Sequence, residues 1–498
     1  MPSPTPEITD AIHEKRWFTL GVLCLSLLII VMDNTILNVA IPSLVRELGA
    51  TNSQLQWIID GYVIVFAGLL LTSGTLGDKF GRKRMLRLGI AIFITGSVAA
   101  TFATSPIHLI LARSFMGAGG SLIMPSTLSI LTNVFRDPVE RGRAIAIWAG
   151  FAGVGVAIGP ITGGLLLQHF SWESVFWVNV PIGIVAIVAG HFFVPRSRDP
   201  DAPPLDPVGA LLSIVGFGVL LYGIIHAPDA GWASVSTLLT ITGGLAILGT
   251  FLLWEWKTEH PMLQLGFFSN PRFSVANLAV TLVFFGLFGS LFLMTQFWQF
   301  VQGYSALQVG IRLIPYAAVL MVVSPRSARL VERFGTKRVM TVGLVIAGAG
   351  LFSLSFLHVG SSYMSVITRF CLLGTGMSMT MAPATESIMG SLPRAKAGVG
   401  SAMNDTTRQV GGALGVAVIG SVFAHVYGDQ ISRLAGFPGD VLEVAREGLG
   451  QALGLAANMG GGAGAAFSSA AKEAFLSGLA MGLRIGTIVL SLAALAVV

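Results

Sequence analysis

Charged residues are scarce in this sequence, and their scarcity excludes most soluble proteins. Only 11% of the 498 residues are charged, and 53% are hydrophobic. A soluble globular domain has about 25% charged residues. The composition therefore indicates a protein that crosses a membrane many times, and it excludes water-soluble enzymes.

Cysteines and metal-binding patterns are also rare. The two cysteines, Cys24 and Cys371, lie in apolar runs and predict neither a disulfide framework nor a metal site. The eight histidines form no HxxxH or HExxH pattern. No Walker phosphate-binding loop is present, so we do not expect ATP as the energy source. We expect no cofactor, no metal and no enzymatic activity. The basic residues behind the net charge of +6 are dispersed among short segments, so we expect no nucleic-acid partner.

Long apolar runs are what the sequence has instead. A helix needs about 20 apolar residues to span a bilayer, and fourteen such runs predict an all-α membrane protein. The predicted spans are 17–40, 55–76, 86–105, 107–131, 144–168, 174–194, 208–226, 233–254, 273–300, 306–325, 338–358, 362–390, 398–426 and 475–497. Lys15 and Arg16 precede the first run as in a signal peptide, but no convincing cleavage site follows, so we expect an uncleaved first helix.

The basic residues predict the orientation in the cytoplasmic membrane. With the N-terminus inside, the external segments hold four of the 30 lysines and arginines, and five more fall within helices, which leaves 21 on the cytoplasmic side. Cytoplasmic loops are enriched in lysine and arginine. We therefore expect both the N-terminus and the C-terminus in the cytoplasm.

The two ends of the sequence resemble each other. Residues 74–84 follow the second span with a glycine and a run of basic residues, as residues 328–338 follow the tenth. The fourth and twelfth spans each carry an arginine, then a glycine, then a proline. This pattern predicts parallel repeats. The expected parts are an N-terminal six-helix bundle at 1–195, a linker with two inserted helices at 196–270, and a C-terminal six-helix bundle at 271–498 with an external loop at about 427–474.

The external loop combines two kinds of sequence. The glycine-rich residues 459–464 are expected to be flexible. Residues 440–455 have helical spacing and are expected to form a short surface helix. We assign no chemistry to this loop.

Three charged residues lie in apolar surroundings. Asp33, Asp60 and Arg113 fall in one layer in the outer half of the membrane, at a rise of about 1.5 Å per helical residue. A carboxylate at membrane depth costs roughly 2.5–3.5 kcal/mol by insertion scales, so it is rarely kept without a function. A nearby guanidinium favours a charged carboxylate, and desolvation favours the protonated form. We therefore expect Asp33, tuned by Arg113, to carry a proton; the alternative is a structural ion pair between the first and fourth spans.

Several residues are candidates for contacting a cationic substrate. Asp60 is expected to be its countercharge or a second protonation site, and the alternative is a hydrated interfacial residue. Trp57 and Tyr62 present aromatic faces that suit quaternary ammonium groups, although aromatic residues also anchor helices at the membrane interface. Glu386, near the cytoplasmic end of the twelfth span, is expected to attract cations in a vestibule or to take part in an inner gate.

Two further groups of residues suggest gates. Asp405 and Arg408 lie one turn apart in the thirteenth span and can pair on one face. We expect them to belong to an inner gate or to a vestibule for cations from the cytoplasm; the alternative is a purely structural pair. The fifth span carries a string of small residues and a proline, namely Gly155, Gly159, Pro160, Gly163 and Gly164. Small residues let helices pack closely and proline bends a helix. We expect a tight outer seal between the two halves; the alternative is ordinary glycine-rich packing.

Four of these patterns resemble signatures of the major facilitator superfamily. Residues 74–84 resemble its loop signature, residues 113–117 resemble the RxxxG pattern of its fourth helix, and residues 155–164 resemble its antiporter signature GxxxGPxxGG. Residues 32–42 resemble the first-helix signature of the fourteen-helix drug:proton antiporters. The resemblance covers essentially the whole chain. It implies the fold of two six-helix bundles with two inserted helices.

The resemblance also implies roles for individual residues. Asp78, with Gly81 and Arg82, is expected to form a charge relay that closes the inner side, beyond the part its basic neighbours play in topology. Asp60 looks like the quaternary-ammonium exporter branch. In that branch the thirteenth helix carries acidic residues implicated in dicationic substrates, whereas here Arg408 stands near Asp405 and can neutralise it.

Together these observations predict a secondary active multidrug transporter. Its expected partners are amphipathic, cationic small molecules, protons and the lipid bilayer, and we expect a monomer. The alternative within transport is a proton-coupled exporter dedicated to one metabolite, antibiotic or lipid. A membrane sensor or scaffold has no reason to keep Asp33 and Asp60 in apolar helices, and the sequence shows no repeated filter or charge ring typical of a channel.

Overall fold

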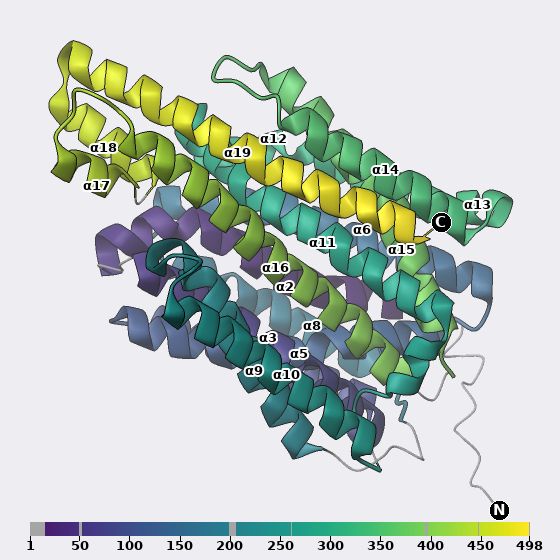
Figure 1. The fold of residues 1–498 in the computed structure, drawn as a ribbon. Coiled ribbons are helices and arrows are strands. Elements are labelled where there is room, and N and C mark those ends of the chain that lie inside the picture. The colour runs from purple at the N-terminus through teal and green to yellow at the C-terminus, as the bar shows by residue number, and fades with distance from the viewer. Residues whose placement is uncertain are drawn as a thin grey trace, which may run out of the picture.

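The computed structural model describes residues 15–48, 52–198, 206–259, 261–393, 397–446 and 448–497. Within these ranges the chain is almost entirely helical and has no strand (Figure 1). The predicted all-α class is confirmed. The helices gather around two large hydrophobic cores, one built mainly by the N-terminal part of the chain and one by the C-terminal part.

The N-terminal bundle contains the first five long helices and a broken sixth. Its elements are α2 (Arg16–Leu48), α3 (Asn52–Phe80), α4 (Arg82–Thr101), α5 (Pro106–Val134), α6 (Pro138–His169), α7 (Ser174–Trp177) and α8 (Asn179–Phe193). The inserted hairpin follows as α9 (Pro207–Ala230) and α10 (Val235–Lys257).

The C-terminal bundle begins after a short 3₁₀ turn, η1 (Leu265–Ser269). Its elements are α11 (Pro271–Gln296), continued by the π-helical turn η2 (Phe297–Val301), then α12 (Ala306–Arg312), α13 (Ile314–Phe334), α14 (Thr336–Leu354), α15 (Tyr363–Gly390), α16 (Ala397–Ser432), α17 (Gly439–Arg446), α18 (Leu449–Met459) and α19 (Gly461–Val497).

Several helices begin at the same local signal, a capping residue followed by proline. Ser105, Asp137 and Asp206 each accept a hydrogen bond from a backbone N–H in the first turn of α5, α6 and α9, and Asn270 does so for α11. Proline stands next in all four cases, where its missing N–H has no partner to lose. The sequence therefore sets the starts of these helices through local chemistry.

The number of membrane spans depends on two helices. Twelve helices of the described residues are long and apolar enough to cross a membrane, and α3, bent by 53° between Leu70 and Thr72, makes a thirteenth if it counts as one span. The remaining predicted span, 362–390, corresponds to α15, which is 28 residues long but contains Arg369 and several threonine and glycine residues. It lies within the C-terminal bundle against α13 and α14.

The predicted external loop is more ordered than the sequence suggests. In place of one short helix over 440–455, the chain forms α17 and α18. Gly460 and Gly461 adopt positive φ angles of 61° and 55° and make a sharp turn. Residues 461–464 are not a flexible linker, because α19 begins at Gly461 and continues to Val497. Gly460 and Gly461 thus turn the chain, and the glycines that follow are part of α19.

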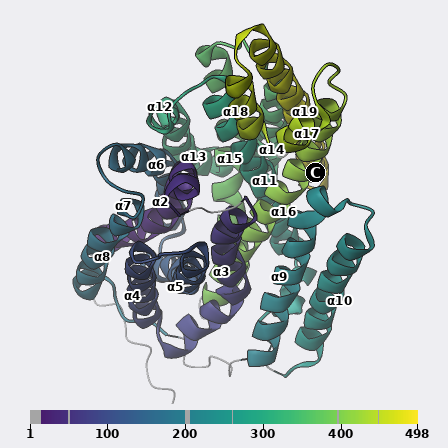
Figure 2. The same cartoon turned by 90° about the vertical axis from the view of Figure 1, so that its left-hand side faces the viewer.

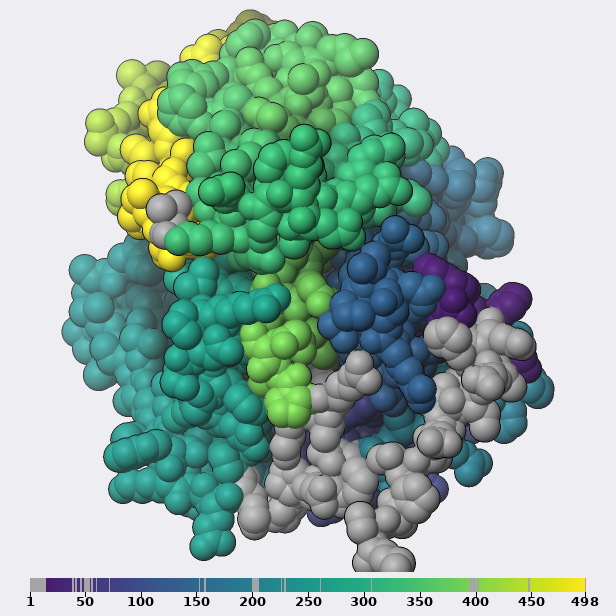
Figure 3. Space-filling view, turned by 90° about the vertical axis from the view of Figure 1, so that its right-hand side faces the viewer, coloured from purple at the N-terminus to yellow at the C-terminus, as the bar shows by residue number. Residues whose placement is uncertain are grey.

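The two bundles meet along their length. On one side α16 packs against α3 and α5, and on the other side α12 and α13 pack against α6. We call the end of the molecule at which α4 and α6 begin and α13 ends the basic end, and the end that carries α17 and α18 the opposite end (Figure 1). Figure 3 looks onto the basic end, where the start of α6 (blue) lies against the C-terminal bundle (green).

The inserted hairpin lies beside both bundles. Helix α9 packs against α3 and α16, with α10 outside it (Figure 2). The Ser213 hydroxyl donates to the Gly68 carbonyl of α3 at 3.0 Å. A Cβ at Gly68 would meet the Ile214 backbone Cα at 2.8 Å, so glycine permits this close approach. The hairpin is thus attached most tightly to the N-terminal bundle.

Candidate functional site

Asp33 lies at the centre of a buried polar site in the N-terminal bundle. Its exposed fraction is 0%. Arg113 of α5 forms an ion pair with Oδ2, and the Nδ2 of Asn179 donates to Oδ1 at 2.8 Å. Both carboxylate oxygens therefore have partners, as the cost of burying a charge requires. The structure brings together the two residues that sequence reasoning placed in one layer.

Arg113 is held by the backbone and by an aromatic ring as well. Its Nε donates to the Ile58 carbonyl at 3.4 Å, and its Cζ lies 4.5 Å from the centre of the Tyr62 ring. A cation over an aromatic face is attracted by the ring quadrupole. Tyr62, 1% exposed, was predicted to contact substrate. The structure places it instead beneath Arg113.

The helices around Asp33 fix its partners. Asn179 begins α8 immediately after the short α7. Its amide also donates to the Ser97 hydroxyl of α4 at 3.1 Å, and that hydroxyl donates to the Phe176 carbonyl at 2.8 Å. Four helices, α2, α4, α5 and α8, thus converge on one carboxylate. Protonation of Asp33 would disturb contacts in all of them.

The other predicted substrate contacts in the second span are not gathered at this site. The side chain of Asp60 lies outside the described residues. The ring of Trp57 packs against Tyr222 and His226 of α9, with centroids 5.9 and 6.4 Å apart. Trp57 therefore contacts the inserted hairpin, and its role toward substrate stays a prediction.

A second buried polar group lies between the bundles on α16. Asp405 is fully buried, and its Oδ1 is 3.9 Å from the NH1 of Arg408. Neither Asp405 oxygen accepts a hydrogen bond from the described residues. The pair predicted on one helix face is thus present but long, and it leaves the carboxylate incompletely satisfied.

Arg408 is surrounded by residues of both bundles. Its NH2 donates to the Thr385 hydroxyl at 3.1 Å. Its Cζ lies 5.1 Å from the Trp148 ring of α6 and 5.5 Å from the Phe284 ring of α11. The guanidinium therefore sits between the N-terminal and C-terminal halves, where a change in their spacing alters its contacts.

The predicted inner gate is an ordered corner at the basic end. Asp78 Oδ1 accepts from the Nε and NH2 of Arg82 at 3.0 and 2.8 Å, and both side chains are buried. Gly81 between them has φ +100°, a conformation that favours glycine. The Arg82 N–H donates to the Ser197 carbonyl at 3.0 Å. This corner joins α3 and α4 to the segment after α8, all within the N-terminal half.

Glu386 forms an ion pair across the two halves. Its Oε1 lies 3.1 Å from the NH2 of Arg141 at the start of α6. The pair is partly exposed at the basic end. This ion pair fits the inner gate, which was one of the two expectations for Glu386. It engages one of the two carboxylate oxygens that were expected to attract substrate. A neighbouring pair, Arg16 with Glu140, joins α2 to α6 with two hydrogen bonds of 3.0 Å.

The glycines of α6 face two different neighbours. A Cβ at Gly155 would meet the Val31 side chain of α2 at 2.8 Å, and Cβ atoms at Gly159 and Gly163 would overlap Thr35 and Ile36 of the same helix. These three lie within the N-terminal bundle, so they do not themselves seal the halves. Gly164 faces the other bundle, because its Cβ would meet Leu307 of α12 at 2.9 Å.

Pro160 and Gly310 complete this contact between the halves. A Cβ on Gly310 would lie 3.1 Å from the carbonyl carbon of Pro160 and 2.8 Å from the backbone nitrogen of Ile161. The prediction of a seal between the halves therefore fits one face of the motif, that of Pro160 and Gly164. The other face, with the remaining three glycines, packs α6 onto the segment of α2 that carries Asp33.

Sequence reasoning missed three residues of these sites, Ser97, Asn179 and Arg141, and it did not single out Trp148. Asn179 carried a signal, since an amide in an apolar run is costly without a partner. Arg141 stood in a basic loop, where its charge served to assign topology. Trp148 was one of many aromatic residues in the spans. Only the fold shows which of these aromatic residues face a charged group.

Comparisons with known proteins agree with this architecture. Residues 23–416 match the family described as Major Facilitator Superfamily. Multidrug efflux pump LfrA of Mycolicibacterium smegmatis is 34% identical over 96% of this chain and 94% of that protein. Methyl viologen resistance protein SmvA of Salmonella typhimurium is 31% identical over 93% of each chain. The tetracenomycin C resistance and export protein of Streptomyces glaucescens is 33% identical over 84% of this chain and 78% of that protein.

Solved structures share the fold at lower identity. A bacterial homologue of the lysosomal transporter Spinster, in an inward-facing and unoccupied conformation, superposes with a TM-score of 0.61 over 97% of both chains at 20% identity. The proton:xylose symporter XylE does so with a TM-score of 0.61 over 97% of this chain and 95% of that chain at 13% identity. The chain therefore belongs to the Major Facilitator Superfamily, a family of membrane transporters, within its multidrug efflux group of the drug:proton antiporter type.

Proposed function

We propose that the chain exports amphipathic, cationic compounds across the cytoplasmic membrane in exchange for protons, and that Asp33 carries the proton. The observation that carries this proposal is the burial of Asp33 against Arg113 and Asn179. Intramembrane carboxylates of this kind are costly and usually functional. The names of the relatives, which refer to drug efflux and to resistance to methyl viologen, support the direction of transport and the class of substrate.

The exchange follows from the electrostatics of the pair. With Asp33 charged, the pair is neutral overall and does not repel an approaching cation. With Asp33 protonated, the buried guanidinium of Arg113 loses its counterion, a change that costs about 3–5 kcal/mol for buried pairs. The uncompensated charge repels a cationic substrate and favours rearrangement of α2 and α5. Proton and cation therefore occupy the protein in turn, as an antiporter requires.

Asp405 is the second carboxylate able to serve a cation. It lies between the bundles, it is buried, and its oxygens accept no hydrogen bond from the described residues. The Trp148 and Phe284 rings nearby suit a cation as well as they suit Arg408. In this proposal Arg408 holds the place of the substrate charge while the site is empty.

The basic end is proposed to face the cytoplasm. It collects the loops in which lysine and arginine are concentrated, as the positive-inside rule requires. Both Arg16, at the start of α2, and Val497, at the end of α19, lie at this end, in keeping with cytoplasmic termini (Figure 1). The Arg141–Glu386 pair then closes the cytoplasmic side, and the Gly164 and Gly310 contacts close the external side.

The test is transport by the purified protein in proteoliposomes. The membrane potential is held at zero with valinomycin and equal potassium on both sides, and a pH gradient is imposed. We expect tetraphenylphosphonium and methyl viologen to move against their gradients, and a protonophore to abolish this movement. A neutral lipophilic drug should move more slowly. Cation movement at the same rate without a pH gradient would contradict proton coupling.

A growth-inhibition panel in an efflux-deficient host then defines the substrate range. Monovalent cations, divalent cations and neutral drugs are compared in cells with and without the protein. Protection against several unrelated cations supports multidrug export. Protection against a single compound would favour the alternative, an exporter dedicated to one metabolite or antibiotic.

A further inference from the structure

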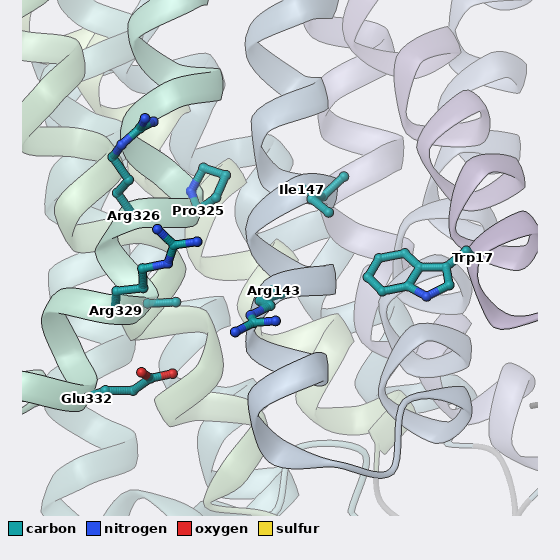
Figure 4. A pocket seen from close by; sticks show the side chains of 8 residues that line it. Trp17, Arg143, Ile147, Pro325, Arg326, Arg329 and Glu332 are labelled. Carbon is teal, nitrogen blue, oxygen red and sulfur yellow. The ribbon is translucent and has the colours of Figure 1, made fainter.

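A cavity of about 290 Å³ lies at the basic end, outside the sites described above. Its walls come from both halves of the molecule. The N-terminal bundle contributes Trp17 of α2 and Arg143 and Ile147 of α6. The C-terminal bundle contributes five residues of α13, namely Pro325, Arg326, Ala328, Arg329 and Glu332 (Figure 4). Any molecule bound here touches both halves.

The cavity has an excess of positive charge. Arg143, Arg326 and Arg329 line it together with one carboxylate, Glu332. None of the four forms an ion pair with any described residue. Arg326 donates from NH1 to its own helix, at the Val322 carbonyl. In Figure 4, Arg143 lies between the α13 arginines on one side and Ile147 and Trp17 on the other.

This charge excludes the proposed cationic substrate and suits a phosphate. Guanidinium groups donate paired hydrogen bonds to phosphate oxygens. Without an anion, like charges on α6 and α13 face each other across the boundary between the halves and repel. A bound phosphate replaces that repulsion by attraction to both helices.

The depth of the cavity indicates that the phosphate belongs to a lipid. Arg143 lies five residues after the start of α6 and Arg329 five residues before the end of α13, each roughly 7 Å along its helix. The headgroup layer of a bilayer is about 5–8 Å thick on each side. Trp17, 44% exposed, is a residue type enriched at that interface. Deeper on α13, Met321 and Val322 are exposed and offer a surface to acyl chains.

We propose that this cavity binds the headgroup of an anionic phospholipid of the cytoplasmic leaflet, and that the bound lipid fastens α6 to α13 and holds the basic end closed. The proposal rests on the proposed orientation of the basic end. Basic pockets between transmembrane helices on the cytoplasmic side are known to hold such headgroups. The lipid composition of the membrane thus sets how readily the inner side opens.

The binding test uses no substrate and no proton gradient, so it is independent of the transport mechanism. Purified wild-type protein and the variants Arg143→Gln, Arg329→Gln and Arg333→Gln are incorporated into phosphatidylcholine nanodiscs with increasing phosphatidylglycerol, and bound lipid is counted by native mass spectrometry. Arg333 is the matched control, because it is on the same helix end but outside the cavity. We expect Arg143→Gln and Arg329→Gln each to weaken binding about fivefold, and Arg333→Gln to leave it unchanged. Equal binding of lipid in all four proteins overturns the site. Displacement of the lipid by millimolar inorganic phosphate also overturns it, because it would show a site for soluble anions.

One reporter tests both whether the bound lipid holds the basic end closed and which side of the membrane the basic end faces. Ala328, in the cavity wall, is replaced by cysteine, and its labelling by a membrane-impermeant maleimide is followed. Labelling should fall severalfold as phosphatidylglycerol rises, and this protection should disappear when Arg143→Gln is added. If the lipid binds but does not protect the cysteine from labelling, the proposal that the lipid holds the basic end closed is wrong. Labelling from outside intact cells overturns the orientation while the nanodisc measurement of binding stands.

Discussion

At the scale of single residues, Asp33 is distinguished by the completeness of its contacts. Arg113 and Asn179 satisfy both oxygens, and four helices meet around them. The sequence allowed the Asp33–Arg113 pair to be predicted, because depth along two helices can be counted. It did not reveal Asn179 as a partner or Tyr62 as a support for Arg113, since these depend on how each helix is rotated.

Asp33→Asn is expected to abolish proton-driven export while folding and ligand binding persist. The amide keeps the shape of the carboxylate but cannot exchange a proton. The measurement is cation transport under an imposed pH gradient, beside ligand binding by the same protein. Asp429→Asn, which removes a carboxylate from an exposed pair with Arg433, is the control. Near wild-type pumping by Asp33→Asn would show that the proton travels elsewhere.

Arg113→Gln is expected to change the pH profile of transport. The substitution removes the charge that compensates the buried Asp33 carboxylate. The pH profile of transport is compared with that of Arg433→Gln, which removes an exposed arginine. An unchanged profile would reduce the Asp33–Arg113 pair to a structural contact.

Asp60→Asn is expected to weaken resistance to cations, most of all divalent ones, and to spare neutral compounds. A carboxylate in a site of low polarity stabilises a cation and gives a neutral drug no comparable benefit. Minimum inhibitory concentrations across the three classes measure this. An equal loss for every compound would assign Asp60 to structure or to proton coupling.

At the scale of the element, α6 combines two kinds of close packing on different faces. Gly159 lies against the Asp33 segment of α2, and Gly164 lies against α12 of the other half. The sequence predicted tight packing but did not separate these faces, because α6 is apolar all round and has no polar side to fix its rotation. The interpretation of the whole motif as a seal between the halves is therefore corrected for Gly155, Gly159 and Gly163.

Leucine at the two positions should have different effects. Gly159→Leu is expected to displace α2 and reduce coupled export, at a cost of roughly 1–3 kcal/mol for overpacking. Gly164→Leu is expected to part α6 from α12 and raise the proton leak of proteoliposomes without substrate. Gly142→Leu is the control on the same helix, because a Cβ there meets no atom within 4 Å. If Gly164→Leu is well folded, tight and active, its packing plays no part in sealing.

At the scale of the whole molecule, the Arg141–Glu386 pair reports on the opening of the basic end. It joins the two halves, whereas Arg16–Glu140 lies within one half. The fold class and span positions followed from composition and apolar runs. The bridge between the halves did not, because residues 245 positions apart come together only in the folded protein.

Glu386→Gln is expected to raise the population open at the basic end by up to about fivefold, since partly exposed pairs contribute about 0.2–1 kcal/mol. Distances between spin labels on α6 and α15 measure this population. Glu140→Gln should leave it unchanged, and exchange of the two charges, Arg141→Glu with Glu386→Arg, should restore it. An identical distance distribution in Glu386→Gln and wild type would remove the pair from the gate.

The attachment of the α9–α10 hairpin bears on the mechanics of the transport cycle. Ser213 and Ile214 fasten α9 to Gly68 of α3, whereas α9 meets α16 through the apolar side chains of Leu220, Ile224 and Ala417. When the halves rock, we expect the hairpin to travel with the N-terminal bundle and to slide over α16. The two moving bodies would then be unequal, with α2–α10 in one and α11–α19 in the other, and the body that includes the hairpin would meet the larger drag in the lipid. Relative to the membrane, we therefore expect most of the motion of each cycle to occur in the C-terminal bundle.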